Sequence, residues 1–300
     1  MAIAIGIAVA ALLYAYLRYR NAMRRDSMRL ATARQALEGC GHLLALLRAL
    51  QQHRGLSSGW LAGERQFERR MGARRQEVER ELIALVETAH AELLKARPCF
   101  TPHDLSLFDF RWKTLVDELQ GLSIEQSIAR HSQMITHTLD WLTALGEARI
   151  ELPVADLVDA DAVRNYANRL PLLAEYLGQA RAVGSGVAAR GTCTPVARVR
   201  LMFLVSRSES LLKQAMQVAG DRQTLAAAHA VAALTGMVRQ QLLAERTVVV
   251  SAEAYFATAT EAIDAVFAWI EACGEDIRRE LEAGRAGEAV SVPERAAGMV

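Results

Sequence analysis

Along most of the chain, apolar residues recur at intervals of three and four positions, which places them on one face of a helix. From Leu37 this spacing continues through Cys40, Leu44 and Leu47 to Gln51. Alanine, leucine, arginine and glutamate dominate the chain, whereas strand-favouring aromatic residues and runs of isoleucine or threonine are scarce. The pattern therefore predicts an all-α protein.

Residues that favour helix ends divide this pattern into two similar halves. In the first half we expect helices over about 37–51, 54–95, 101–120 and 123–146, and in the second half further helices fill about 161–284. The residues expected to cap helix starts are Thr101 before Pro102, Ser123 with Gln126, Thr194 before Pro195, Asp221 and Ser251. The second half thus repeats the plan of the first.

Short loops between such helices favour two antiparallel four-helix bundles in tandem. We expect the first bundle over residues 35–148 and the second over residues 161–284. Residues 149–160 include Pro153 and show no clear period, so we expect a linker there. The small and polar residues 285–300 are expected to form a flexible tail.

The chain begins with an uncharged apolar run from Ala2 to Leu17. As a helix with a rise of about 1.5 Å per residue, this run measures roughly 24 Å, somewhat less than the ~30 Å hydrocarbon core of a bilayer. No arginine precedes the run, and the arginines that follow it are Arg18, Arg20, Arg24, Arg25 and Arg29.

This arrangement predicts a transmembrane anchor over residues 1–19 and a basic juxtamembrane helix over residues 20–34. Because positively charged flanks stay in the cytoplasm, we expect a single-pass protein of the inner membrane with the bulk of the chain cytoplasmic. The alternative is a buried core helix, which a run of this length also allows.

Charge and cysteine usage exclude several classes of protein. The formal net charge is +1 and arginines alternate with glutamates, so the sequence has no basic stripe for a nucleic acid. The four cysteines are scattered singly, unlike a disulfide framework or a zinc site: Cys40, Cys99, Cys193 and Cys273. The histidines form no pair at i, i+4. We therefore expect no nucleic acid partner, no metal and no cofactor.

One short motif occurs in each half. RGLSSGWLAG over residues 54–63 and RAVGSGVAARG over residues 181–191 share the pattern R-x-x-x-S-G. The pairs that this alignment makes are Arg54 with Arg181, Ser58 with Ser185, and Gly59 with Gly186. Neither copy has the lysine of a phosphate loop or the strand-to-helix turn of a nucleophile elbow, so we expect no enzyme activity.

Three glycines in the first copy are spaced four apart, at Gly55, Gly59 and Gly63. Glycine inside a helix costs about 1 kcal/mol relative to alanine, so such a strip needs a compensating role. The bare surface predicts close approach of a facing helix, of a small ligand, or of both.

The segments LLALLRALQQHRGLSSGWLAGE, QARAVGSGVAARGTCTP and LLAERTVVVSAEAYF resemble motifs of the nitrate- and nitrite-sensing domain of bacterial signalling proteins. The resemblance spans roughly residues 35–285. It implies two antiparallel four-helix bundles with an anion held between helices by arginines, which are Arg54, Arg181 and Arg246 when carried over by position. Such domains are usually fused to an effector, and we find none in this sequence. The resemblance therefore implies a separate, unidentified signalling partner, and a homodimer is left open.

Nitrate is a flat ion whose single charge is spread over three oxygens, and guanidinium is a flat cation whose paired N–H groups match such an edge. We therefore expect Arg54, Arg181 and Arg246 to bind nitrate or nitrite. The residues expected to support this site are Gly55, Ser57, Ser58, Gly59, Ser185 and Gly186. Two alternatives stay open. Arg54 pairs with a buried acid such as Glu64 or Glu245, or the protein is a membrane-anchored helical scaffold or oligomerisation module without a ligand.

Overall fold

The computed structural model describes residues 2–217, 222–243, 248 and 250–290, with side chains from residue 12 to residue 284 in these ranges. Its α-helices are α1 (Ala2–Leu61), α2 (Glu68–Leu93), α3 (Pro102–Glu118), α4 (Ile124–Gly146), α5 (Ala160–Arg164), α6 (Leu170–Arg190), α7 (Pro195–Ala215), α8 (Arg222–Met237) and α9 (Ala252–Val290). Short 3-10 turns occur at Arg65–Phe67 and Leu119–Gly121, and π-helical turns at Glu147–Glu151, Asn165–Arg169 and Val238–Leu243. The described ranges contain no strand, so the prediction of an all-α protein is confirmed.

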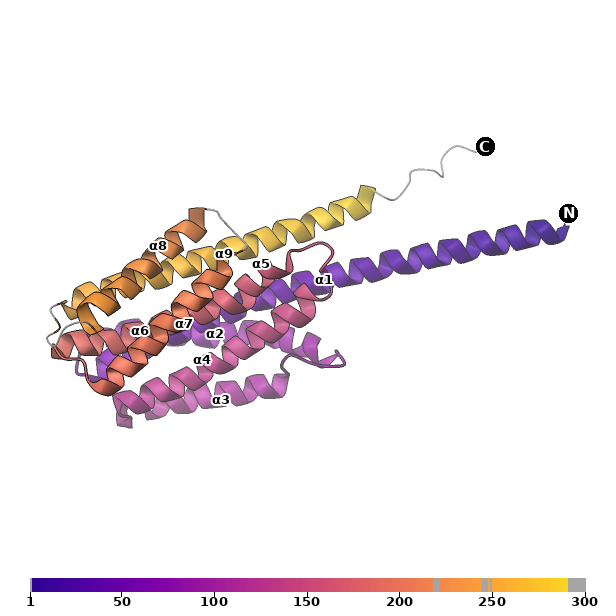
Figure 1. The fold of residues 1–300 in the computed structure, drawn as a ribbon. Helices are drawn as coiled ribbons and strands as arrows, with labels where there is room; N and C mark the ends of the chain where they lie inside the picture. The colour runs from indigo at the N-terminus through magenta and orange to yellow at the C-terminus, as the bar shows by residue number, and fades with distance from the viewer. Residues whose placement is uncertain (1, 218–221, 244–247, 249, 291–300) are drawn as a thin grey trace.

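The helices pack as two sets of four. In the first set, α1 and α3 each pack against both α2 and α4, and in the second set α6 and α8 each pack against both α7 and α9. α1 also contacts α6 and α9 (Figure 1). One continuous cluster of buried apolar side chains runs through both sets. The finer description, tandem antiparallel bundles over residues 35–148 and 161–284, stays a prediction.

Both segments expected to be irregular are regular in part. Glu147–Glu151 continues α4 as a π-helical turn, and Val154 and Val158 beyond it are buried in the core. At the other end of the chain, α9 continues through Val290. The rest of the expected tail, residues 291–300, lies outside the described residues.

The expected helix caps are formed wherever the chain is described, at Thr101, Ser123, Thr194 and Ser251. In each, the hydroxyl oxygen accepts a hydrogen bond from the backbone N–H three residues later. Asp104 and Gln126 complete capping boxes, because their side chains accept the N–H of the capping residue. The expected cap at Asp221 lies outside the described residues.

The predicted start of a new helix at Arg54 is wrong, because α1 continues through this residue to Leu61. The chain reverses at Gly63, whose φ of +108° lies in the region that favours glycine. Phe67 then packs on Gly59, where a Cβ would lie 2.4 Å from the phenylalanine ring. Two of the three spaced glycines therefore serve the turn and a close ring contact.

The expected membrane anchor over residues 1–19 needs correction. Within the described residues, no helix is both long enough and apolar enough to cross a membrane. The apolar run overlaps residues 1–11, whose side chains lie outside the description, and arginines interrupt α1 from Arg18 onwards. Single-pass anchoring in the inner membrane is therefore not supported.

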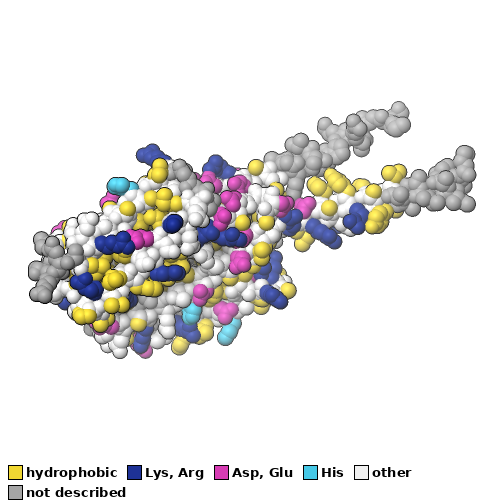
Figure 2. Space-filling model, viewed as in Figure 1, with side chains coloured by type: hydrophobic (Ala, Val, Ile, Leu, Met, Phe, Trp, Pro, Cys, Tyr) yellow, Lys and Arg dark blue, Asp and Glu magenta, His cyan; other side chains and the backbone are white. Residues whose placement is uncertain are grey.

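The N-terminal part of α1 protrudes beyond the other helices (Figure 1). Its described side chains mix apolar and basic groups in the space-filling view (Figure 2), and the exposed apolar ones are Leu12, Leu13, Tyr14, Tyr16, Leu17, Tyr19 and Met28. Residues 20–34, expected as a juxtamembrane helix, end inside the molecule, because Leu30 and Ala33 are buried.

Candidate functional site

The crossing of α1 and α6 brings two of the predicted arginines together. Arg54 lies near the C-terminal end of α1, and Arg181 lies in the middle of α6. Nη2 of Arg54 is 3.2 Å from the position that a Cβ would take at Gly178 of α6. Nη2 of Arg181 is 3.8 Å from the corresponding position at Gly55 of α1. Each guanidinium thus lies over a glycine of the opposite helix.

The guanidinium of Arg54 is buried and held by a carboxylate. Its Nη1 donates to Oε1 of Glu175 at 2.6 Å, and its Nη2 donates to Oε2 of Glu175 at 3.1 Å. Nη1 also donates to the Ser132 hydroxyl at 3.0 Å. Only 4% of the Arg54 side chain and 5% of the Glu175 side chain are exposed. Arg54 is therefore paired with a buried acid, as the alternative interpretation expected. The acid is Glu175 and not Glu64 or Glu245.

Glu175 receives further hydrogen bonds from two amides. Nε2 of Gln51 on α1 donates to Oε2 at 3.0 Å, and Nε2 of Gln179 on α6 donates to Oε1 at 2.9 Å. Each carboxylate oxygen therefore has one guanidinium donor and one amide donor.

Arg181 has a different environment. Its Nη1 donates to the Thr260 hydroxyl at 3.1 Å, and its Cζ lies 4.9 Å from the centre of the Phe256 ring, both on α9. Burial, followed by the nearby positive charge of Arg54, lowers the pKa of Arg181. Beside it, the buried Tyr255 hydroxyl donates to the Ala180 carbonyl at 2.8 Å.

Two histidines lie beside Arg54 in the core. Nδ1 of His131 is 2.7 Å from the Ser127 carbonyl, which only accepts, so this nitrogen carries the proton. Nε2 of His131 then accepts the N–H of His53 Nδ1 at 2.8 Å. Burial is the main cause that lowers the pKa of His53 to about 3 and that of His131 to about 4. Both rings are therefore neutral at neutral pH and add no charge to the site.

The charges at the crossing do not cancel. Arg54 and Glu175 neutralise one another, while no described carboxylate lies within salt-bridge distance of Arg181. Asp264, whose charge favours the protonated form of Arg181, is paired with Arg48 instead. One positive charge therefore remains on a partly buried guanidinium.

The predicted supporting residues have mixed roles. The hydroxyls of Ser57 and Ser58 donate to carbonyl oxygens of their own helix, at His53 and Arg54 respectively. The buried Ser185 hydroxyl has no hydrogen-bond partner in the described part of the chain. For the remaining glycines, the side chain nearest to the position that a Cβ would take is Arg181 at Gly55, Phe67 at Gly59 and Arg190 at Gly186. Arg246 lies outside the described residues, so its part in the site stays a prediction.

Glu175 and Gly178 are the site residues that the sequence did not reveal. Both precede Arg181 on α6, in the segment LAEYLGQAR, where a single carboxylate stands among apolar residues. A charge on an otherwise buried helical face is a usable signal for a buried partner. Its partner at Arg54 is 121 positions away, which no local pattern reveals.

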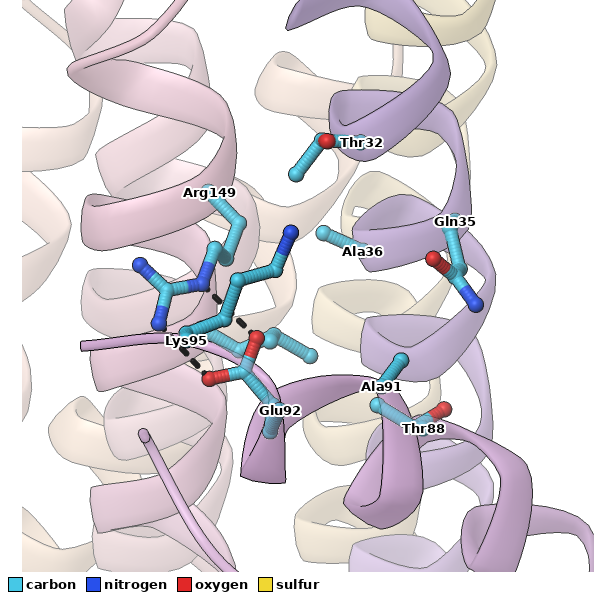
Figure 3. A pocket seen from close by; sticks show the side chains of 9 residues that line it. Thr32, Gln35, Ala36, Thr88, Ala91, Glu92, Lys95 and Arg149 are labelled. Carbon is cyan, nitrogen blue, oxygen red and sulfur yellow. Dashed lines mark hydrogen bonds and ion pairs between the residues drawn. The ribbon is translucent and has the colours of Figure 1, made fainter. Parts of the chain in front are cut away.

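A second buried arginine–glutamate pair lies between α2 and the π-helical turn (Figure 3). Nε and Nη2 of Arg149 donate to Glu92 at 2.7 and 2.8 Å, and Nη2 also donates to the Arg97 carbonyl. Burial raises the pKa of Glu92, but the hydrogen bonds from Arg149 and Cys99 and the charge of Arg149 together outweigh burial, so the pKa is lowered. The adjoining cavity of about 10 Å³ is close to the minimum for one water, and nitrate does not fit.

Within the described chain, no group of three or more histidine, cysteine, aspartate or glutamate side chains is placed to hold a metal ion.

A family model described as "Nitrate and nitrite sensing" matches residues 45–278. A solved structure described as that of the NasR transcription antiterminator matches 93% of this chain and 76% of its own, with a TM-score of 0.65 and 20% identity. At this identity the likeness concerns the fold. No curated protein matches the chain.

Proposed function

Because the chain belongs to the nitrate and nitrite sensing family, we propose that it binds nitrate or nitrite at the crossing of α1 and α6 and passes the signal to a separate protein. The observation that carries this proposal is Arg181. This guanidinium is partly buried and has no described carboxylate partner, and it lies close enough to Arg54 for the charge of Arg54 to lower its pKa. A monovalent anion neutralises the charge that remains there.

The chemistry of the site fits a small planar anion. Guanidinium presents paired N–H donors in one plane, which match two oxygens of nitrate or nitrite. The Thr260 hydroxyl, already bonded to Arg181, is a further donor within the same cluster. Arg54 and Arg246 complete the set proposed from the sequence, and Val248, two residues beyond Arg246, donates its N–H to Gly191 at the end of α6.

The role is sensory, without a chemical step. The output passes to a partner protein that remains unidentified, and the tandem four-helix bundles are the scaffold on which a shift between helices travels. A homodimer is compatible with this scheme.

One observation favours a second candidate, a helical scaffold without a ligand. Both terminal nitrogens of Arg54 are bonded to Glu175, which belongs to the other helix set. In a scaffold, such pairs only hold helices together, and no anion binds.

Calorimetric titration of the purified full chain with nitrate, at constant ionic strength against chloride, distinguishes the two functions. We expect nitrate binding, and we expect Arg181→Ala to weaken it by about ten- to a hundredfold, because a charge-assisted hydrogen bond contributes about 1.5–3 kcal/mol. Arg34→Ala is a matched control, because its guanidinium is also part of a partly buried hydrogen bond to α9, at the Leu281 carbonyl. Nitrate heats no different from those of chloride would instead support the scaffold.

A further inference from the structure

The Glu175 carboxylate binds the guanidinium of Arg54 in the way that a planar anion would. It is a flat, singly charged group that presents two oxygens to the paired N–H groups of one guanidinium. It is also buried, and it reaches Arg54 from the opposite helix. Nitrate and this carboxylate therefore compete for the same donors.

We propose that Glu175 is a built-in competitor of the anion, which holds Arg54 in the ligand-free protein and releases it when nitrate or nitrite binds. This inference rests on the function proposed above and adds the residue that sets affinity and couples binding to helix position. The bound anion then bridges Arg54 on α1 and Arg181 on α6, in place of the direct ion pair.

The donors around Glu175 make this exchange feasible. A buried carboxylate that loses its only cationic partner is strongly destabilising. Here Gln51 donates to Oε2 and Gln179 to Oε1, so each oxygen keeps an amide hydrogen bond after Arg54 departs. Ser132 likewise remains bonded to Nη1 of Arg54.

The balance of charge supports the same order of events. Before binding, the positive charge of Arg181 has no described carboxylate partner at the crossing, so an incoming anion pairs with Arg181 first. Once there, it lies next to Arg54 and repels Glu175. The exchange replaces a contact between two helices with a contact through the ligand, and this changes how α1 is held against α6.

The test is calorimetric titration of nitrate into Glu175→Gln, which keeps the shape of the side chain and removes its charge. We expect nitrate to bind about tenfold or more tightly than to the unmodified protein, because the competing charge is gone. Glu92→Gln is the matched control, since it neutralises another buried carboxylate that is paired with an arginine, and it should leave nitrate affinity unchanged.

A second variant keeps the inference testable if Glu175→Gln does not fold. Gln179→Ala removes one of the amides that hold the released carboxylate, so we expect nitrate to bind several-fold more weakly. Unchanged or weaker affinity in Glu175→Gln, or unchanged affinity in Gln179→Ala, overturns the competitor role while nitrate binding by the unmodified protein keeps the proposed function. Absence of nitrate binding by the unmodified protein overturns both.

Discussion

Arg54 and Arg181 occupy corresponding positions of one repeated motif, and the fold gives them different surroundings. Arg54 meets a carboxylate from α6, whereas Arg181 meets a hydroxyl and an aromatic ring from α9. The difference arises because Glu175 lies six residues before Arg181 on the same helix, where it faces Arg54. A repeat in sequence therefore does not imply equivalent electrostatics. The charge of Arg54 is neutralised by Glu175, whereas the charge of Arg181 has no described carboxylate partner.

The buried histidine pair predicts a dependence of stability on pH. The pKa values of His53 and His131 fall from an ordinary value of 6.5 to about 3 and about 4 on folding. Below about pH 6.5 the unfolded chain therefore binds protons that the folded protein does not, and the free energy of unfolding falls as pH falls. Each histidine contributes a slope of up to about 1.4 kcal/mol per pH unit in this window.

Urea unfolding between about pH 7 and pH 5 measures this slope. A variant with both His53→Gln and His131→Gln should have a flatter dependence, whatever its absolute stability. His103→Gln, at an exposed position, is the control and should keep the original slope. An equally steep dependence in the double variant would mean that other groups cause it.

At the scale of elements, the crossing of α1 and α6 depends on one glycine more than on the other. A Cβ at Gly178 would lie 3.2 Å from Arg54 Nη2, tighter than an ordinary contact, so this guanidinium has to move. A Cβ at Gly55 would lie at an ordinary 3.8 Å from Arg181.

These distances predict different effects of alanine on the free energy of unfolding at the two positions. Gly55→Ala should raise the free energy of unfolding by up to about 1 kcal/mol, because alanine is the better helix former. Gly178→Ala should lose that gain, since it pushes Arg54 away from Glu175. Chemical denaturation of both variants compares them directly, and an equal gain at the two positions would show that the crossing tolerates a Cβ on either side.

The elements also show which features a sequence can predict. Helix caps at Thr101 and Ser123 were predictable because a cap and its partner are three residues apart. The end of α1 was missed, because glycines spaced four apart resemble a helix face, and only the left-handed φ at Gly63 reveals the turn. The pair of Arg54 with Glu175 was missed because it forms between helices from the two halves.

At the scale of the whole molecule, the two helix sets share one core. Buried apolar side chains form a continuous cluster, and α1 packs against helices of both sets. Because this shared core joins the two sets, we expect a single cooperative unfolding transition.

The tryptophans allow this expectation to be measured. Trp60, Trp112 and Trp141 lie in α1, α3 and α4 of the first set, and Trp269 lies in α9 of the second. Fluorescence of Trp269→Phe reports mainly on the first set, and its midpoint in urea should coincide with the midpoint from circular dichroism of the same variant. Two separate midpoints would show that the sets unfold independently.

The length of α1 connects the candidate site to a segment far from it. This helix runs unbroken from Ala2 to Leu61, about 90 Å at the usual rise, with Arg54 near one end and the protruding segment at the other. A hydrogen-bonded helix behaves as a stiff rod on this scale, so a small twist or slide at Arg54 reaches Tyr19 with little loss. In the proposed function, the residue that binds the anion and the segment that extends beyond the other helices therefore belong to one continuous helix.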